Sequence, residues 1–395
     1  MMSISYAPLP TLSIIFKAIT TRSLPDTVLS EKWCKPPDKA YWFSRSAWSF
    51  VTIVRLKHLI ENKPFSSIYV WIPDFFCNMS LELLRNMGVN LIFYPIKDDL
   101  FPDEEACYKI AHKIKLDLFL FVHYFGIPII PNWLTDFCKQ KKAWLIEDAV
   151  HALYPFRGIG EFGDFVLYSP YKLLPMPDGA IMIIRKGGPN NILSDTSIEY
   201  ELNKIVGSLY KKSGFSEDAS LIWLAKRVLQ MLGLRGSHKT PFMNNSNSTH
   251  IVFQHPKMTS LAKSFLSLLI DLLDSVASIR KHNLQTWYFY LSAIFNKEDL
   301  NYLNDIEYIP YLACLVCNNE KTAERIYRIL QEMRLPVMTW PDLPPETVNS
   351  PEIHNVAIKL RRTRIYLPVH ESVSKKQIEK FLNRLRGKSD KYISD

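Results

Sequence analysis

The 395-residue sequence has no apolar run that reaches the ~18–20 residues needed to span a bilayer, so a membrane-spanning protein is not expected. It also lacks a basic N-terminal region followed by a long apolar core and a small-residue cleavage site, which argues against export. Low-complexity tracts, collagen-like periodicity and internal repeats are absent. With 47% hydrophobic and 22% charged residues, the composition is typical of a folded soluble protein, and we expect it in the cytoplasm.

Cysteine is scarce, and the six cysteines are spread along the chain. Of these, Cys314 and Cys317 alone have metal-like spacing, and no second Cys or His pair stands near them to complete a tetrahedral site. They lie in the apolar segment 311–318, which predicts a buried strand. The sequence therefore predicts no metal site.

The formal net charge of +9 and a pI near 9.0 favour anionic partners such as phosphates or nucleotides, or an anionic membrane surface. No basic–aromatic motif accompanies the basic clusters at 139–142 and 361–362, so nucleic acid is not an expected partner. The basic, Trp-bearing amphipathic segment 221–232 could lie on a membrane surface. Packing on its own protein is the favoured interpretation.

The length predicts two or three compact units. From Trp42 to Arg185, short apolar runs alternate with helical patterns, which indicates a mainly parallel sheet covered by helices on both faces. The expected strands are 67–72, 91–94, 116–122, 143–146, 165–168 and 180–185. We expect an N-terminal arm (1–30), a large domain (31–260) with a polar, atypical insertion (187–250), and a smaller α+β C-terminal domain (261–395).

One lysine and one aspartate stand where two of these strands end. Asp148 closes the apolar strand in residues 145–152 (LIEDAVHA), and Lys172 follows the next strand in residues 162–172 (FGDFVLYSPYK). Open α/β folds place ligands at this edge of the sheet. A lysine that forms a Schiff base and an aspartate that keeps a pyridinium nitrogen protonated are the two groups that pyridoxal phosphate requires.

Six segments in the same order resemble motifs of the DegT/StrS (DegT/DnrJ/StrS) family of pyridoxal-phosphate-dependent sugar aminotransferases. The resemblance covers about residues 40–185 and 280–385. The segments are residues 44–47 (SRSA), 121–128 (FVHYFGIP), 145–152, 162–180, 280–283 (RKHN) and 365–371 (IYLPVHE). The resemblance implies an aspartate-aminotransferase-like fold (fold type I), with a seven-stranded, mainly parallel sheet between helices.

The resemblance also implies roles for three residues around the cofactor ring. By that match Lys172 is the Schiff-base lysine and Asp148 is the partner of the pyridinium nitrogen, while His151 lies near the ring and its phenolic oxygen. Lys172 would then act as the general acid/base of the transamination, and a neighbouring cationic ring lowers the pKa of a lysine.

The phosphate of the cofactor is expected at the start of the helix that follows residue 44. The resemblance assigns Ser46 and Ala47 to this position, where backbone N–H groups and a hydroxyl face an anion. Ser169 takes the place of the family's phosphate-binding serine.

Three departures from the family pattern stand out. Arg45 replaces the glycine of the phosphate motif, and Ser169 lies only three residues before Lys172. The family's segment that sends contacts across the dimer is not recognisable. The aromatic side chain that stacks on the ring is assigned to Phe76, with Phe75 or Cys77 as alternatives.

The implied activity is transfer of an amino group from an amino acid, glutamate or glutamine, to a keto-sugar. The resemblance further implies a nucleotide-linked acceptor, a role in cell-envelope polysaccharide or secondary-metabolite biosynthesis, and a homodimer with its active site at the subunit interface. The charge of +9 fits an anionic acceptor. Two alternatives remain: other pyridoxal-phosphate chemistry such as dehydration, against which Lys172 argues, and a non-catalytic or regulatory protein that keeps the fold.

Overall fold

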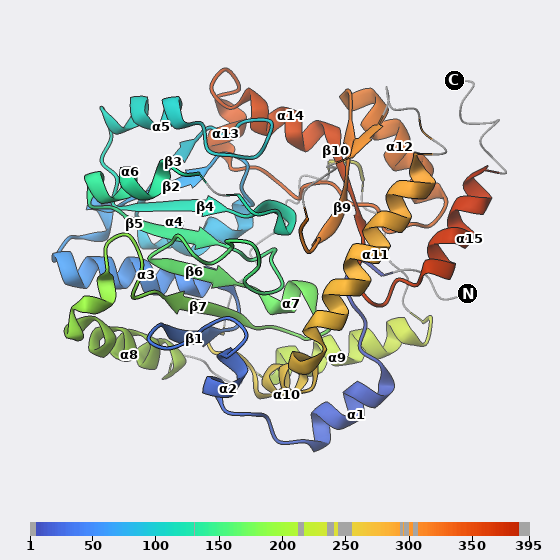
Figure 1. The fold of residues 1–395 in the computed structure, drawn as a ribbon, viewed down its shortest axis with the longest axis horizontal. Helices are drawn as coiled ribbons and strands as arrows, with labels where there is room; N and C mark the ends of the chain where they lie inside the picture. Colours follow the sequence, from blue (N-terminus) through green and yellow to red (C-terminus); the bar gives the residue numbers. More distant parts are fainter. Residues whose placement is uncertain are drawn as a thin grey trace.

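The computed structural model describes residues 5–129, 131–211, 217–234, 241–243, 255–292, 295, 300–302 and 307–386. Its centre is a seven-stranded sheet in the order β1-β7-β6-β5-β4-β2-β3 (Figure 1). The strands are β1 (Lys39–Phe43), β2 (Tyr69–Pro73), β3 (Asn90–Tyr94), β4 (Leu118–Val122), β5 (Trp144–Asp148), β6 (Phe165–Tyr168) and β7 (Ala180–Ile184). The pairs from β6 to β3 are parallel, and β7 is antiparallel to both neighbours. The predicted fold class is therefore confirmed.

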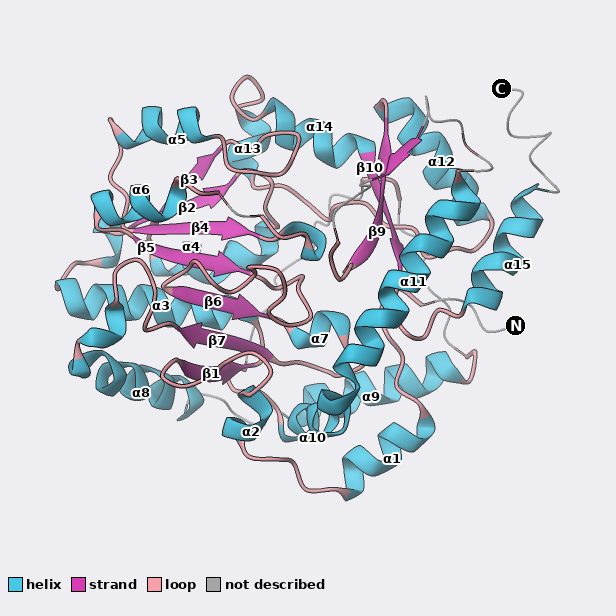
Figure 2. Cartoon of the chain, in the orientation of Figure 1, coloured by secondary structure: helices cyan, strands magenta, loops and turns pink. Residues whose placement is uncertain are grey.

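Helices pack on this sheet because its central strands are apolar on both faces. Every residue of β4, β5, β6 and β7 is buried, as expected for strands covered on two sides. α3 (Ser46–Glu61) packs on β1, β6 and β7, α5 (Glu104–Ala111) on β3, and α6 (Leu134–Lys141) on β5, while the short α4 (Glu82–Met87) packs on α3. Figure 2 shows that the strand ends near α7 (Pro170–Leu173) face the C-terminal part of the chain.

Several elements were not predicted from the sequence. The N-terminal arm contains α1 (Leu12–Thr20) and α2 (Asp26–Ser30), and β1 adds an antiparallel edge strand. The region treated as a polar insertion begins with α8 (Thr196–Lys211), which packs on α3. Its buried side chains recur at helical spacing, although the polar residues between them hide the pattern: Ile198, Leu202, Ile205, Val206 and Leu209.

The C-terminal region is built on a three-stranded antiparallel sheet of β8 (Leu300–Tyr302), β9 (Leu312–Cys317) and β10 (Arg364–Pro368), in the order β10-β9-β8. Its helices are α10 (Ser260–Leu269), α11 (Leu273–Leu291), α12 (Glu320–Glu332), α13 (Pro345–Asn349), α14 (Asn355–Thr363) and α15 (Lys375–Arg386). Cys314 and Cys317 are buried in β9, so the strand predicted for them is confirmed. Within the described ranges no cluster of three or more potential metal ligands occurs.

The amphipathic helix expected near 221–232 is α9 (Glu217–Met231). It packs on α10, where the ring of Trp223 meets Phe265 edge-on at 5.7 Å. The opposite face leaves Leu221 and Ile222 more than half exposed. Helix α9 thus packs on its own protein along one face only. No helix in the described part of the chain is both long and apolar enough to cross a membrane.

Two of the recognised motifs, residues 280–283 and 365–371, contact each other where α11 packs on the segment after β10. The buried amide of Asn283 donates to the carbonyls of Val369 (3.1 Å), His370 (3.3 Å) and Val373 (2.8 Å). One turn further along, the indole N–H of Trp287 donates to Pro368 O at 2.9 Å. The segments 280–283 and 365–371, which are far apart in the sequence, therefore pack directly against each other.

We predict that Asn283→Ala lowers the free energy of unfolding by about 2–4 kcal/mol, because buried carbonyls lose their donor. Urea denaturation followed by tryptophan fluorescence measures the change. Gln285→Ala, an exposed position on the same helix, serves as the control and should change stability by less than about 0.5 kcal/mol. Equal effects of the two substitutions would contradict the stabilising role assigned to the Asn283 hydrogen bonds.

Candidate active site

A buried glutamate fixes the edge of the sheet where the site lies. The carboxylate of Glu147 in β5 accepts hydrogen bonds from the backbone N–H groups of Gly160, Phe162 (3.0 Å) and Gly163 (3.0 Å). It also accepts one from His123 Nε2 at 2.7 Å, since His123 Nδ1 is occupied by a backbone N–H. Burial alone would raise the pKa of Glu147, but these donors bring it below its usual value. One ionised side chain thus joins β4, β5 and the loop before β6.

Asp148, the next residue, lies on the opposite face of β5 because side chains alternate along a strand. It is 2% exposed, and its Oδ1 accepts the N–H of Val150 at 3.1 Å. Among the described residues no cation lies within ion-pair distance of it. Burial raises the pKa of Asp148 to about 6, although the charge of Lys172 acts to lower it. The surrounding groups therefore do not fully offset the free-energy cost of ionising the Asp148 carboxyl.

Lys172 lies on the single turn of α7, directly after β6. Burial lowers the pKa of its amine, but Tyr171, Tyr311 and Asp148 outweigh that effect, so the net shift is upward. Arg280 holds this turn in place, because its buried guanidinium donates to Leu173 O at 2.6 Å and to Tyr311 O at 3.2 Å. The lysine is thus positioned by a contact between α7 and the C-terminal region.

The side chain of Lys172 lines a cavity of about 570 Å³ between the sheet edge and the C-terminal region. From the N-terminal half, the lining includes Arg45, Cys77, Ser80, Phe125, His151 and Tyr171. From the C-terminal half it includes Tyr311, Leu312, Thr339, Trp340 and Tyr366. A cavity of this size, mostly apolar with a few polar groups, is typical of a small-molecule site.

Four rings of the lining form an aromatic stack in the order Tyr366, Phe125, His151, Tyr311. Their centroids are separated in turn by 4.8, 5.9 and 4.7 Å. His151 Nδ1 accepts the N–H of Phe125 over 3.4 Å, and burial beside Lys172 holds the pKa of His151 well below its usual range. The imidazole is therefore neutral and can present its second nitrogen as a donor.

The stack depends on a close approach at Gly126, which has φ +85°. A Cβ atom there would lie 2.4 Å from Ile309 O, so any other residue would push the two segments apart. The N–H of Tyr311 donates to Phe125 O at 2.9 Å across the same contact. The glycine of the 121–128 motif is explained by this contact between the two halves of the chain.

The residues expected to bind phosphate, Ser46, Ala47 and Ser169, are not among the residues that line the cavity, but their sequence neighbours Arg45 and Tyr171 are. Ser46 and Ala47 are the first two residues of α3, and the N-cap residue before them, Arg45, provides no side-chain cap. Ser169 is fully buried, and its hydroxyl has no hydrogen-bond partner among the described residues. Gly179 connects the two segments, because its N–H donates to Ser44 O (3.0 Å) and its carbonyl accepts from Tyr171 N (3.4 Å).

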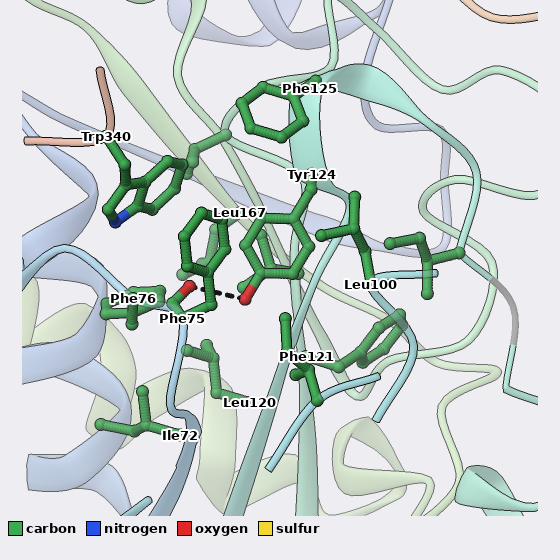
Figure 3. Close-up of a cluster of buried hydrophobic side chains, with 14 of the residues drawn as sticks. Ile72, Phe75, Phe76, Leu100, Leu120, Phe121, Tyr124, Phe125, Leu167 and Trp340 are labelled. Atoms are coloured by element: carbon green, nitrogen blue, oxygen red, sulfur yellow. Dashed lines mark hydrogen bonds between the residues drawn. The ribbon is translucent and has the colours of Figure 1, made fainter. Parts of the chain in front are cut away.

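The aromatic residues proposed to stack on the cofactor lie elsewhere. Phe76 packs on Phe50, and Phe75 stacks on Trp340 at 4.3 Å and accepts a hydrogen bond from the Tyr124 hydroxyl through its carbonyl (Figure 3). Neither phenylalanine is among the residues that line the cavity, whereas Cys77, the third candidate, is. The role assigned to Phe76 stays a prediction.

Sequence reasoning missed most of the aromatic lining. Tyr311, Trp340 and Tyr366 lie in the C-terminal region, far along the chain from Lys172, and a tyrosine or tryptophan in an apolar segment carries no mark of a site. Tyr171 was quoted within a motif but given no role. Its position beside Lys172 was the available signal.

Comparison with known proteins identifies the fold. No family model and no curated protein sequence matches this chain. Solved structures do: the aminotransferase TlmJ from Streptoalloteichus hindustanus is 14% identical with a TM-score of 0.71 over 100% of both chains. Spr1654 from Streptococcus pneumoniae, described as a candidate sugar aminotransferase and solved in its PLP form, is 13% identical with a TM-score of 0.68 over 99% of both. A DegT DnrJ EryC1 StrS aminotransferase from Brucella abortus is 13% identical, with a TM-score of 0.63 over 95% of this chain and 94% of that one. These likenesses confirm the aspartate-aminotransferase-like fold.

We predict that Asp148 makes the stability of the ligand-free protein depend on pH. The native carboxyl keeps its proton up to about pH 6, whereas the unfolded chain releases it near pH 4. Stability therefore falls as pH rises through this window, by about 2–3 kcal/mol in all. Asp148→Asn should abolish this fall, because the amide oxygen can still accept the Val150 N–H but cannot ionise.

Urea denaturation of wild type and variant between pH 4 and pH 8 measures the effect. The two proteins should be about equally stable at pH 4, and the variant should be the more stable at pH 8. Asp136→Asn, at an exposed position on α6, is the matched control and should follow the wild-type profile. Parallel profiles for wild type and Asp148→Asn would show that Asp148 ionises freely in the folded protein.

Proposed function

We propose that the protein is a pyridoxal-phosphate-dependent aminotransferase that transfers an amino group from an amino acid to a keto-sugar. The observation that carries the proposal is that Asp148 and Lys172 lie at the ends of adjacent strands β5 and β6, at one edge of the sheet, where Lys172 lines the cavity and Asp148 is buried nearby. Each shifts the pKa of the other, so the two charges interact. The fold shared with structures described as aminotransferases supports the same conclusion.

The residues present fit the cofactor. Asp148 is a buried carboxylate with no cation within ion-pair distance among the described residues, and Ser169 has a buried hydroxyl without a partner in that part of the chain. Lys172 would hold the cofactor covalently, Asp148 its ring nitrogen, and Ser46, Ala47 and Ser169 its phosphate. When bound, pyridoxal phosphate supplies an electron sink that stabilises negative charge at the substrate α-carbon.

The chain's own groups account for proton handling in the site. The carboxylate of Asp148 would pair with the positive charge of the bound ring nitrogen, and that charge would offset the cost of burying Asp148. Lys172 Nζ accepts and returns the proton at the substrate carbon, for which it must be uncharged. A cation paired with Asp148 would cancel the negative charge that helps to raise the pKa of Lys172. The pKa of Lys172 would then fall, which favours the neutral amine. Because His151 is neutral, it could donate a hydrogen bond to the phenolic oxygen of the bound ring without adding a positive charge to the site.

We infer glutamate or glutamine as the amino donor and a nucleotide-linked keto-sugar as the acceptor, used in cell-envelope polysaccharide or secondary-metabolite biosynthesis in the cytoplasm. The net charge of +9 supports an anionic acceptor. The description of Spr1654 as a candidate sugar aminotransferase supports a sugar. We further infer a homodimer. In support, the exposed faces of α1 and α9 carry Leu12, Phe16, Ile19, Leu221 and Ile222, each more than half exposed in the single chain.

The proposal predicts that purified protein binds pyridoxal phosphate with a visible absorption band. Borohydride should abolish the band and leave the reduced cofactor on the peptide that contains Lys172, as peptide mapping would show. Adding glutamate to unreduced protein should bleach the band, because the amino group passes to the cofactor in the first half-reaction.

Two variants sharpen this measurement. Lys172→Ala should lose the band that borohydride reduces, whereas Lys226→Ala, an exposed lysine on α9, should behave like wild type. Protein that takes up no cofactor would overturn the enzyme proposal and favour a non-catalytic protein that keeps the fold. A band that forms but does not bleach with any amino acid would point to other pyridoxal-phosphate chemistry.

A further inference from the structure

Arg45 occupies an unusual position for an arginine. It is the N-cap residue of the 16-residue helix α3, with extended backbone angles (φ −142°, ψ 151°), and it is one of the residues that line the cavity together with Lys172. Serine, threonine, aspartate and asparagine are preferred at this position because they accept the first free N–H groups of the helix. Arginine has no acceptor, so the side chain serves some purpose other than capping.

The guanidinium of Arg45 is held in one orientation. Both terminal nitrogens donate to Pro177 O at 3.2 Å, and one also donates to Ser44 O at 3.2 Å. The carbon of the guanidinium lies 4.1 Å from the centre of the Tyr171 ring. Tyr171 is the neighbour of Lys172, so the arginine is fixed beside the turn that carries the lysine.

The positive charge of Arg45 is not neutralised within the described ranges, where no carboxylate lies within ion-pair distance of it. Asp178 is near enough for the two charges to interact. Its oxygens, however, accept hydrogen bonds from Thr259 N (3.0 Å) and Thr259 Oγ1 (2.7 Å). A fixed, half-buried cation without a paired anion at a cavity wall is suited to an anionic ligand.

Three donors that suit one anion lie on segments joined through Gly179. They are the uncapped first turn of α3, the guanidinium of Arg45, and the fully buried hydroxyl of Ser169, which has no partner among the described residues. The Gly179 hydrogen bonds to Ser44 and Tyr171 hold these segments side by side. Gly179 has φ +130°, a backbone conformation that residues with a side chain rarely adopt, so this connection favours glycine.

We propose that Arg45 binds the phosphate of pyridoxal phosphate and supplies, from the same chain, the cation that neutralises it. The proposal rests on the proposed function. Arg45 would then make the site selective for phosphorylated over unphosphorylated pyridoxal, because its positive charge attracts the phosphate, which pyridoxal lacks.

The test compares the binding of pyridoxal phosphate and of pyridoxal, measured separately by quenching of tryptophan fluorescence in cofactor-free protein. Arg45→Met should weaken binding of pyridoxal phosphate by about 10- to 100-fold and change binding of pyridoxal by less than about 2-fold. Arg45→Lys, which keeps the charge but not the fork, should fall between them. Arg55→Met, at a half-buried arginine of the same helix outside the cavity lining, is the control and should leave both affinities unchanged.

The outcomes separate this inference from the proposed function. Equal loss of both affinities in Arg45→Met would assign Arg45 a structural role and overturn the inference. Unchanged affinity for pyridoxal phosphate would overturn it as well, while the aminotransferase proposal would stand. Wild-type protein that binds neither compound would overturn both.

Discussion

The candidate site depends on a carboxylate that is not itself in the cavity. Glu147 is completely buried, and its ionisation costs free energy that only the surrounding donors offset. Those donors come from the loop before β6 and from His123 after β4, so satisfying Glu147 draws three neighbouring segments into register. Because Asp148 follows immediately, the same constraint fixes where its side chain points. A buried network that is fully satisfied sets geometry as well as stability.

Asp148 differs from Glu147, because its neighbours do not offset the free-energy cost of ionising its carboxyl. The folded protein raises the pKa of Asp148 to about 6, which means that the ionised form is destabilised there. Lys172 also carries a pKa raised in part by this carboxylate. A bound cation at Asp148 would relieve both effects. Under the proposed function, part of the free-energy cost of ionising the buried Asp148 would be recovered when a cationic ring binds beside it.

The sequence was sufficient to predict strands β2 to β7 and to place Asp148 and Lys172 at the ends of β5 and β6, because apolar strands are local signals. The roles assigned to Asp148, Lys172 and His151 stay predictions. The sequence was insufficient where the signal is weak or distant. α8 escaped notice because polar residues separate its apolar positions, and β1 because a short edge strand pairs with β7 alone. Tyr311, Trp340 and Tyr366 reach the cavity through contacts with residues some 190 to 240 positions earlier, such as Phe125. No periodicity in the sequence encodes such contacts.

The dependence on distant contacts has a structural consequence. Lys172 is held on one side by β6 and on the other by Arg280 of α11, which also binds the carbonyl of Tyr311. Asn283, one turn further along α11, holds the segment after β10, which follows the strand that contains Tyr366. A single helix therefore sets the position of the lysine and of both ends of the aromatic stack. A displacement of α11 would therefore move the cavity lining and the turn that carries Lys172 together, so that their relative position is preserved.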